Sequence, residues 1–249
     1  MFHVVVPARF AATRLPGKPL AQIHGRPLIQ WVWERACASG VASVIVATDD
    51  ERILEAASAF GADTVLTSAA HASGTDRIAE VARSRGFAAA DIVVNLQGDE
   101  PLMPGSVLRD LAACLSERPL TDIATAVAPI QSLAEFLDPN CVKALRALDG
   151  RALYFSRAPV PWPRDRTVEG RPAEFGGAWR HIGIYAYRVR SLLEFAATPP
   201  TPLELAEKLE QLRALESGMS IHLMELGEPP ALGVDTPQDL ERVRQLLKA

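Results

Sequence analysis

The sequence predicts an α/β fold built on a mainly parallel sheet that helices cover on both faces. Between residues 4 and 96, apolar runs of strand length alternate with helical patterns. The expected strands are almost entirely apolar, as in parallel sheets that are buried on both sides. With 249 residues, of which 48% are hydrophobic and 22% charged, the chain can form one large domain or two small ones.

The first half is predicted to consist of consecutive strand–helix–strand units. Strands are expected at residues 4–6, 44–48, 64–67 and 92–96, and helices at about residues 28–39, 51–60 and 75–84. Connections of this kind join strands that run parallel.

The pattern changes in the second half of the chain. Extended runs at residues 122–130 and 141–156 suggest added strands rather than another repeat, and residues 159–179, with many Pro, Arg and Gly, indicate a long polar connection. The remaining expected elements are a strand at 181–188, a helix at about 202–217, a strand at 221–226 and a terminal helix that begins near Thr236.

Composition excludes several classes of function. The formal net charge is −4 and the basic residues are scattered, which disfavours a surface that follows a nucleic-acid backbone. Cys37, Cys114 and Cys141 are odd in number and lack C-x-x-C spacing, so neither a disulfide framework nor a zinc site is expected. We find no cleavable leader and no apolar run long enough to span a bilayer, and we therefore expect a cytoplasmic protein.

The most informative segment is VVVPARFAATRLPGKPL at residues 4–20, where an apolar strand enters a loop that holds Arg9, Arg14 and Lys18. Small residues and Pro16 and Gly17 accompany these cations, so the loop can cradle a triphosphate. It matches neither the P-loop nor the dinucleotide-binding glycine fingerprint. The alternative is a solvated basic surface loop, but ligands of open α/β sheets bind at this end of the strands.

A second motif, VVNLQGDEP, places Asp99 after a buried strand, at the same expected sheet edge. A carboxylate there suits Mg²⁺, which takes one or two carboxylates together with water and phosphate oxygens. Gly98 would leave room for a nucleotide, and Pro101 would fix the turn. The alternative is a tight turn in which Asp is favoured for local reasons.

A third motif, GVDTPQDL, is a strong helix start, with Thr236 as N-cap, Pro237 in the first turn and Asp239 three residues after the cap. Asp235 has no role in that cap. It could favour the helix dipole or serve as a second carboxylate that faces Asp99 across a metal ion.

A fourth motif, HASGTDR at residues 71–77, follows the third strand and opens a helix. Its donor-rich turn could contact a base or a ribose. The alternative is an ordinary loop with Thr75 as the helix cap and Arg77 as a surface charge.

Together these motifs make the chain resemble the 3-deoxy-manno-octulosonate cytidylyltransferases, also called CMP-Kdo synthetases. The resemblance covers nearly the whole chain and is carried by PARFAATRLPGKPL, VATDDERI, HASGTDRIAEV, VNLQGDEP, ALYFSRAPVPW, RHIGIYAYR, PLELAEKLEQLRALE and GVDTPQDLERV. The combination of PAR…TRLPGKPL, QGDEP and GVDTP is specific, whereas one piece alone would be weak. Residues 165–178 are the variable part, in which we find no residue of the family pattern to assign.

The resemblance implies a Rossmann-like nucleotidyltransferase fold: a mainly parallel mixed sheet flanked by helices, with a smaller inserted β-rich region for dimerisation and substrate binding. It implies one domain over residues 1–249, with nucleotide binding mainly in 1–120, sugar binding and dimerisation mainly in 121–230, and a metal-binding turn and C-terminal helix in 231–249. A homodimer built partly on residues 150–190 is also expected.

The implied activity is Mg²⁺-dependent transfer of CMP from CTP to the anomeric hydroxyl of Kdo, an eight-carbon acidic sugar, with release of pyrophosphate. The product is the activated donor for lipopolysaccharide assembly. By similarity to the family, the residues that act in catalysis are Arg9, Arg14, Lys18, Asp99 and Asp235, of which Asp99 and Asp235 would bind Mg²⁺. The nucleotide would contact Pro7, Ala8, Arg9, Lys18, Ser73, Gly74 and Arg77. The sugar would contact Gln97, Arg157, His181, Tyr185, Glu210 and Gln211.

Each residue of the implied sugar pocket also has a structural explanation. Arg157 could be an edge charge, and His181 and Tyr185, four apart on one strand face, could be polar residues of the core. Glu210 and Gln211 lie in a helical pattern in which Leu205, Leu209 and Leu212 are expected to face the core, so both could be solvated.

Other functions stay open from sequence alone. The nearest is a cytidylyltransferase for another acidic sugar such as sialic acid, or a uridylyl or guanylyl transferase with the same cradle. A hydride-transfer enzyme is disfavoured because the glycine fingerprint is missing. A nucleotide-sensing module would bind CTP without releasing pyrophosphate.

Overall fold

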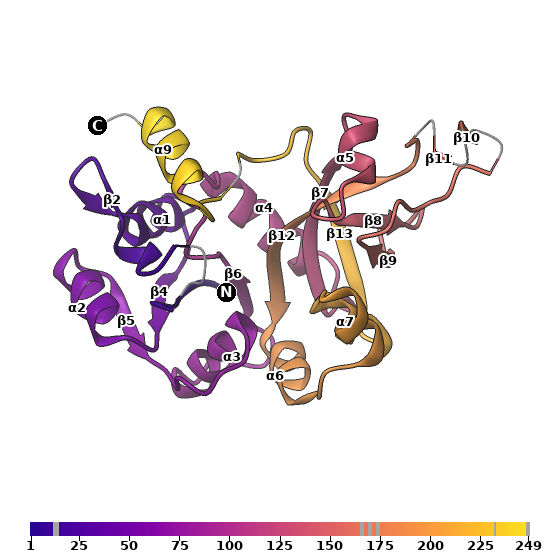
Figure 1. Cartoon of the computed structure of the whole chain (residues 1–249). Coiled ribbons are helices and arrows are strands. Elements are labelled where there is room, and N and C mark those ends of the chain that lie inside the picture. Colours follow the sequence, from indigo (N-terminus) through magenta and orange to yellow (C-terminus); the bar gives the residue numbers. More distant parts are fainter. Residues whose placement is uncertain (12–14, 165–166, 169–170, 173–174, 232, 248–249) are drawn as a thin grey trace. The chain divides into compact units, whose positions relative to one another are not determined.

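The computed structural model describes the 249-residue chain apart from residues 12–14, 165–166, 169–170, 173–174, 232 and 248–249 (Figure 1). The chain forms two compact units. The first unit comprises Met1–Ala113, Ala186–Ala196 and Pro230–Ala249, and the second comprises Cys114–Tyr185 and Ala197–Pro229.

The first unit is built on parallel strands, as the sequence predicts. Its strands are β1 (Phe2–Ala8), β4 (Ser43–Thr48), β5 (Asp63–Leu66) and β6 (Ile92–Asn95), in the order β6-β1-β4-β5. In the central strand, Val4 pairs with Val44 of β4 and Val94 of β6, and its side chain is fully buried. This burial explains the unbroken apolar runs of the sequence.

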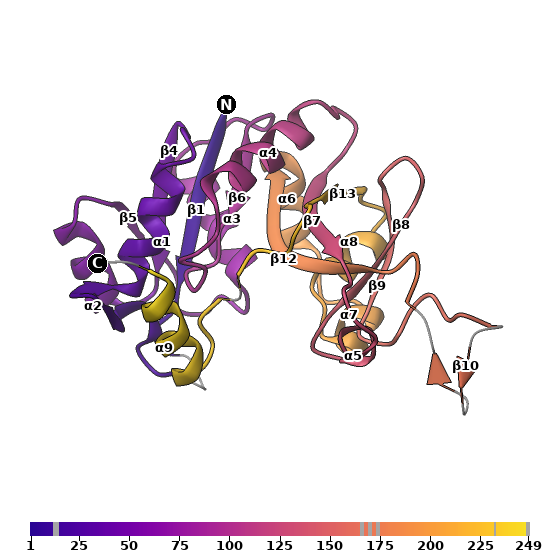
Figure 2. The ribbon, with the colours of Figure 1, turned by 90° about the horizontal axis from the view of Figure 1, so that it is seen from above.

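Helices surround these strands in both views (Figures 1 and 2). They are α1 (Leu28–Cys37), α2 (Glu51–Ala59), α3 (Gly74–Ser84), α4 (Gly105–Ser116), α6 (Val189–Ala197) and α9 (Pro237–Leu246). The short elements η1 (Lys18–Leu20), β2 (Gln22–Ile23) and β3 (Arg26–Pro27) connect β1 to α1. The expected helices at about 28–39, 51–60 and 75–84 are confirmed, whereas the sequence reading did not identify α4 and α6.

The sequence offered Thr75 as the cap of α3 and Arg77 as a surface charge, and the structure contradicts both. Ser73, not Thr75, is the N-cap, because its side chain accepts a hydrogen bond from the Asp76 N–H at 3.2 Å. Arg77 is not a surface charge, since it is fully buried. The predicted cap of α9 is confirmed: Thr236 accepts from the Asp239 N–H at 3.2 Å.

The helix α9 packs on the first unit through an apolar cluster. The members of this cluster are Ile23, Leu28, Trp31, Val234, Leu240, Val243 and Leu247. Each buried aliphatic side chain stabilises such packing by roughly 1.5–3 kcal/mol. Because Val234 is fully buried and Thr236 caps the helix, Asp235 between them is held in the first unit.

The second unit is a mixed β-structure, as the extended runs of the sequence suggest. Its strands are β7 (Ile123–Pro129), β8 (Lys143–Arg146), β9 (Ala152–Ser156), β12 (Trp179–Arg188) and β13 (Ile221–Glu225), with short β10 (Thr167–Val168) and β11 (Arg171–Pro172). The pair β13·β7 is parallel, whereas β8 pairs antiparallel with β9 and with β12. The last three residues of β12 belong to the first unit. A short helix α5 (Leu133–Leu137) follows β7.

The helix expected at about residues 202–217 is divided into α7 (Pro202–Glu207) and α8 (Gln211–Glu216). The break occurs at Lys208, whose φ of 55° is left-handed and ends α7. The chain direction changes there, so one apolar stripe cannot run through both helices. Leu205 is 53% exposed, in contrast to the prediction, whereas Leu209 and Leu212 are buried.

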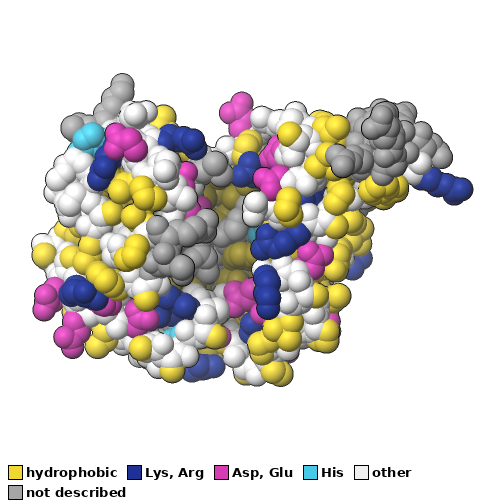
Figure 3. All heavy atoms as spheres, in the orientation of Figure 1, with side chains coloured by type: hydrophobic (Ala, Val, Ile, Leu, Met, Phe, Trp, Pro, Cys, Tyr) yellow, Lys and Arg dark blue, Asp and Glu magenta, His cyan; other side chains and the backbone are white. Residues whose placement is uncertain are grey.

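Charged side chains are mixed over the face that Figure 3 shows, with the basic and acidic groups of the described residues interspersed. This agrees with the small net charge of −4. No helix in the described part of the chain is both long and apolar enough to cross a membrane.

Candidate active site

A cavity of about 220 Å³ opens in the first unit, where β1 and β6 end. It is lined by Pro7, Ala8, Arg9, Ala11, Lys18, Pro19, Gly74, Gln97, Gly98 and Asp99. These residues come from the end of β1, the loop after it, η1, the loop after β6 and the first turn of α3. The carboxyl edge of parallel strands is where open α/β sheets bind ligands, and the sequence placed the first two motifs at this edge.

The loop after β1 carries the predicted cations. Arg9 is half-buried and lines the cavity, and Arg14 lies outside the described residues. The two ends of the loop meet where the Gly17 N–H donates to the Phe10 carbonyl at 3.0 Å. The Arg52 guanidinium of α2 lies over the Phe10 ring, 3.3 Å from its centroid. These contacts fix the point at which η1 begins with Lys18.

The loop after β6 approaches the end of β1 so closely that Gly98 cannot be replaced without a shift. A Cβ at residue 98 would lie 2.8 Å from the Pro7 carbonyl oxygen and 3.5 Å from the Ala8 Cβ. Because the Pro7 oxygen belongs to a strand backbone, it cannot turn away as a side chain would. The absence of a side chain at Gly98 therefore lets the two loops converge on one cavity.

Lys18, Asp99 and Asp235 form an ionic cluster, although the two carboxylates are separated by more than half of the chain. The Lys18 Nζ donates to Asp99 Oδ2 at 2.6 Å and to Asp235 Oδ1 at 3.2 Å. The exposed fractions of the three side chains are 14%, 30% and 51%. Burial lowers the pKa of Lys18, but the two carboxylates outweigh burial and raise that pKa above its ordinary value. The sequence-predicted convergence of Asp99 and Asp235 is thus present in the structure.

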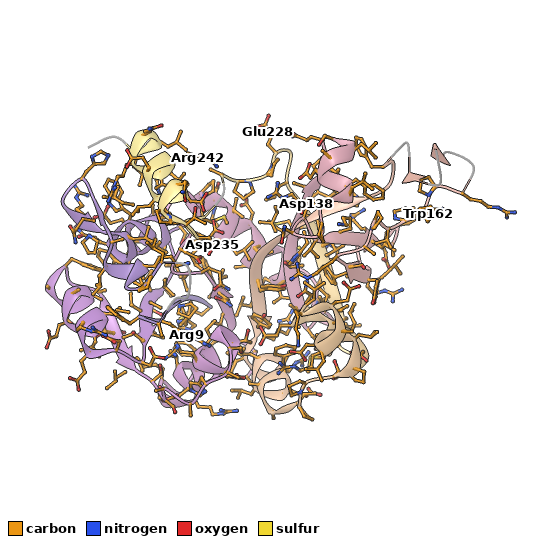
Figure 4. The ribbon with its side chains drawn as sticks, viewed as in Figure 1. Arg9, Asp138, Trp162, Glu228, Asp235 and Arg242 are labelled. Carbon is orange, nitrogen blue, oxygen red and sulfur yellow. The ribbon has the colours of Figure 1, made fainter. Side chains whose placement is uncertain are left out.

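The backbone of residues 233–235 holds Asp235 in this position. The Val234 N–H donates to the Asp99 carbonyl at 2.8 Å. A Cβ on Gly233 would lie 3.0 Å from the same oxygen and 2.9 Å from Glu100 Oε1. In Figure 4, Asp235 lies just before α9, which carries Arg242, and Arg9 lies in the same unit.

The chemistry of this cluster fits a divalent cation. Asp99 and Asp235 are hard oxygen donors from two separate loops, and both already contact one cation, the Lys18 ammonium. Mg²⁺ prefers one or two carboxylates and completes its shell with water and phosphate oxygens. The adjacent cavity offers space for such phosphates.

The first turn of α3 contributes to the cavity through Gly74. Arg77, one turn later, does not line it: its Nη2 donates to Asp49 Oδ2 at 2.7 Å, and its Nη1 donates to Thr67 Oγ1. The buried Nε of Arg77 has no hydrogen-bond partner among the described residues. Arg77 therefore ties α3 to the ends of β4 and β5, and its contact with a nucleotide stays a prediction.

Five of the six predicted sugar residues lie in the second unit, and Gln97 lies in the first. Arg157 is half-buried and donates to three backbone carbonyls, which belong to Glu207 (2.7 Å), Pro139 (3.0 Å) and Lys208 (3.4 Å). It is thus tied to the end of α7 and is more than an edge charge.

His181 and Tyr185 share a face of β12, with their rings 5.5 Å apart. The His181 Nε2 lies 3.0 Å from Thr125 Oγ1, and its ring meets the edge of Phe155. Burial lowers the pKa of His181 to about 3, so the imidazole is neutral at physiological pH.

Glu210 and Gln211 lie at the start of α8. Gln211 is only 7% exposed, so the structural alternative of a solvated face is wrong for it. Its Nε2 has no hydrogen-bond partner among the described residues. Glu210 Oε1 lies 3.7 Å from Arg213, which makes a two-pronged ion pair with Glu204 at 2.6 and 2.8 Å.

Sequence reasoning missed Lys143, which supports Arg157. Lys143 is fully buried, and its Nζ donates to the carbonyls of Arg157 (2.6 Å) and Asp138 (2.9 Å). Burial lowers the pKa of Lys143 and outweighs the nearby Cys141, Asp138 and Glu207, which raise it. The available signal was a lysine within the apolar run CVKAL, since a charge inside a strand needs partners.

The whole chain is similar to known proteins. Residues 3–221 match the cytidylyltransferase family. The 3-deoxy-manno-octulosonate cytidylyltransferase of Pseudomonas fluorescens is 53% identical over 250 residues, which cover 100% of this chain and 98% of the relative. The protein of the same name from Thioalkalivibrio sulfidiphilus is 52% identical over 250 residues, which cover 100% and 99%.

Solved structures agree with these relatives. A CMP:2-keto-3-deoxy-manno-octonic acid synthetase complexed with CTP is 43% identical, with a TM-score of 0.90 over 98% of this chain and 97% of the other. A cytidylyltransferase from Leptospira borgpetersenii has a TM-score of 0.61 at 16% identity, over 100% and 88%. The second likeness shows the fold alone, and the first confirms the expected mixed, mainly parallel α/β architecture.

Proposed function

The chain belongs to the 3-deoxy-manno-octulosonate cytidylyltransferase family, and we propose that it transfers CMP from CTP to the anomeric hydroxyl of Kdo. The hydroxyl oxygen forms a bond to the α-phosphorus, the bond to the leaving pyrophosphate breaks, and the hydroxyl proton passes to solvent. The product, CMP-Kdo, is an activated sugar for lipopolysaccharide synthesis. The sialic acid alternative receives no support from the relatives, which are named for the Kdo reaction.

The observation that carries the proposal is the cluster of Lys18, Asp99 and Asp235 beside the cavity at the ends of β1 and β6. A nucleotidyl transfer needs cationic groups for the triphosphate and a means of holding the reacting oxygens in line. Lys18 and Arg9 line the cavity and supply two of these cations. We assign Arg14 to the same role from the family pattern.

We propose that Pro7, Ala8, Ser73 and Gly74 hold the cytosine and the ribose. Gly74 lies against Pro7, since a Cβ on Gly74 would be 3.5 Å from the Pro7 Cγ, so the α3 turn and the end of β1 form one wall. Arg77 acts below this wall by fixing α3. The nucleotide would then lie with its phosphates toward Lys18.

We propose that the reaction depends on Mg²⁺ held by Asp99 and Asp235. When bound, this ion would neutralise charge on the reacting phosphate. The protein's own contribution is positional: Gly98 and the Val234–Asp99 hydrogen bond fix the two carboxylates, and Lys18 stabilises the negative charge that develops on pyrophosphate.

For the sugar we propose Gln97, Arg157, His181, Tyr185, Glu210 and Gln211. A guanidinium suits the Kdo carboxylate, and Arg157 is preset by its carbonyl contacts. The neutral imidazole of His181 suits hydrogen bonding to hydroxyl groups rather than charge pairing. The Gln211 Nε2 is buried and lacks a partner among the described residues, so it would donate to a sugar oxygen once sugar binding opens its surroundings.

We further propose that the protein acts in the cytoplasm as a homodimer, built partly on residues 150–190. The free state of Cys37, Cys114 and Cys141 supports a reducing compartment. Sedimentation and gel filtration of the purified chain test the assembly.

The experiment that tests the function is pyrophosphate release from CTP, UTP, ATP and GTP, each paired with Kdo or with sialic acid, with Mg²⁺ and then with EDTA. We expect release only from CTP with Kdo, and only with Mg²⁺. Release with another pair would overturn the base or sugar assignment. No release with any pair would contradict the proposed activity and favour a binding role, and activity in EDTA would contradict the metal.

A further inference from the structure

Lys18 contacts the two carboxylates that we assign to the metal ion. Its Nζ lies 2.6 Å from Asp99 Oδ2 and 3.2 Å from Asp235 Oδ1. The Asp99 contact is as short as a strong charge-assisted hydrogen bond, and the Asp235 contact is a longer and weaker hydrogen bond. The Lys18 side chain is 14% exposed, whereas Asp99 is 30% and Asp235 51% exposed, so the cluster is partly buried, with Lys18 on its inner side.

The same side chain also lines the nucleotide cavity, together with Arg9 and Gln97. Lysine carries its charge on four rotatable methylene groups. The Lys18 backbone is fixed by a hydrogen bond from its N–H to the Leu15 carbonyl at 3.1 Å. The ammonium can consequently reach the carboxylates or the cavity by side-chain rotation alone.

Charge decides between these two positions. One ammonium and two carboxylates sum to −1, which suits a site without ligand. A divalent cation bound to the same carboxylates would lie within a few ångströms of the ammonium, and like charges at that distance repel strongly in a partly buried site. Triphosphate oxygens in the cavity would give the ammonium other anionic partners.

We propose, on the basis of the function inferred above, that Lys18 exchanges partners during substrate binding. In the nucleotide-free protein its ammonium pairs Asp99 with Asp235 and competes with the divalent cation for them. When CTP enters, Lys18 moves to the phosphate oxygens and leaves both carboxylates to the metal. Lys18 thereby couples metal binding to nucleotide binding.

The test is the affinity of the nucleotide-free protein for Mn²⁺, a paramagnetic substitute for Mg²⁺, measured by electron paramagnetic resonance. We expect Lys18→Met to bind Mn²⁺ on the order of tenfold more tightly than the unmodified chain, because a competing charge is removed. Lys18→Gln is the second variant. The matched control is Arg242→Met, which removes a positive charge from α9, where Arg242 pairs with Asp239 at 4.0 Å; its affinity should stay within about twofold.

The double variant Lys18→Met/Asp99→Asn locates the effect, and it should lose the gain. If Lys18 were only a structural bridge, its removal would let the carboxylates separate, and Mn²⁺ would bind more weakly. Unchanged or weaker binding in both Lys18 variants, or a gain that survives Asp99→Asn, overturns the exchange. Pyrophosphate release by the unmodified chain is measured on the same preparation, so a failure of the proposed activity is detected separately from the metal affinities.

Discussion

Replacement of Gly98 by alanine tests how the two loops of the cavity are brought together. The new Cβ would lie 2.8 Å from the Pro7 carbonyl oxygen, closer than such atoms approach each other in folded proteins. It would also touch the Ala8 Cβ and the Ile29 Cδ1 at 3.5 Å. The loop after β6 must then move away from β1, and with it Asp99.

The expected cost follows from overpacking, which typically destabilises a protein by about 1–3 kcal/mol. For a chain of this size each kcal/mol lowers the melting temperature by about 2–4 °C, so we expect a loss of roughly 2–10 °C. Displacement of Asp99 and of the cavity wall should also lower kcat/KM for CTP, on the order of tenfold to hundredfold.

The assay combines thermal unfolding with steady-state pyrophosphate release. Gly227→Ala is the matched control, because a Cβ at Gly227 meets no atom of the described residues within 4 Å and its φ is not left-handed. The control should match the unmodified chain in both measurements. A Gly98→Ala variant with unchanged melting temperature and unchanged kcat/KM would refute the argument that this close approach shapes the site.

Three further substitutions, at His181, Arg77 and Gly233, test other parts of the structure. Because His181 has a pKa of about 3 in the folded protein and about 6.5 when unfolded, the unfolded chain binds the extra proton. The free energy of unfolding should therefore fall as the pH is lowered from 6.5 to 4, by up to about 1.4 kcal/mol per pH unit from this group. Urea unfolding at several pH values should show a weaker dependence of this free energy on pH in His181→Asn than in the unmodified chain. Arg77→Lys cannot keep both the Asp49 and the Thr67 contact, so the free energy of unfolding should fall by roughly 1–3 kcal/mol. An unchanged urea midpoint would show that these two contacts of Arg77 do not stabilise the fold. Gly233→Ala should raise the Mg²⁺ concentration for half-maximal activity several-fold, since its Cβ presses on the Asp99 carbonyl; equal requirements in this variant and the unmodified chain would show that the approach is tolerated.

The parallel strands of the first unit and four of its helices could be predicted from sequence because their signals are local, whereas α4 and α6 were missed. The apolar strands, the cap at Thr236 and the short motifs around Lys18 and Asp99 each depend on neighbouring residues. The convergence of Asp235 with Asp99 also followed, because both lie beside motifs that the family resemblance joins in one site. The cavity could then be located because open α/β sheets bind ligands at the carboxyl ends of their strands.

Other features depend on tertiary contacts that local patterns do not reveal. From sequence alone, Arg77 looks like an exposed charged side chain. Its partners Asp49 and Thr67 lie on other segments and come close only in the folded chain. The break at Lys208 has no glycine or proline to signal it, so the pattern predicted one continuous helix. The burial of the Gln211 side chain likewise depends on tertiary contacts and has no local sequence signal.

The second unit was least accessible to prediction. Its helix α5 is short, and its sheet mixes parallel and antiparallel pairs, so strand identity alone does not give pairing. The role of Lys143 depends on carbonyl groups from two other segments. A sequence reading can identify such a lysine as unusual but cannot name its partners.

The most direct test of the central claim is detection of CMP-Kdo by mass spectrometry in reactions of the unmodified chain, Asp99→Asn and Asp235→Asn with CTP, Kdo and Mg²⁺. We expect the unmodified chain to form CMP-Kdo and pyrophosphate in equal amounts. Both variants should react about 10²–10³-fold more slowly, which is the usual effect of removing a key electrostatic group. Absence of CMP-Kdo from the unmodified chain, or full rates in both variants, would contradict a CMP transfer that depends on these two carboxylates.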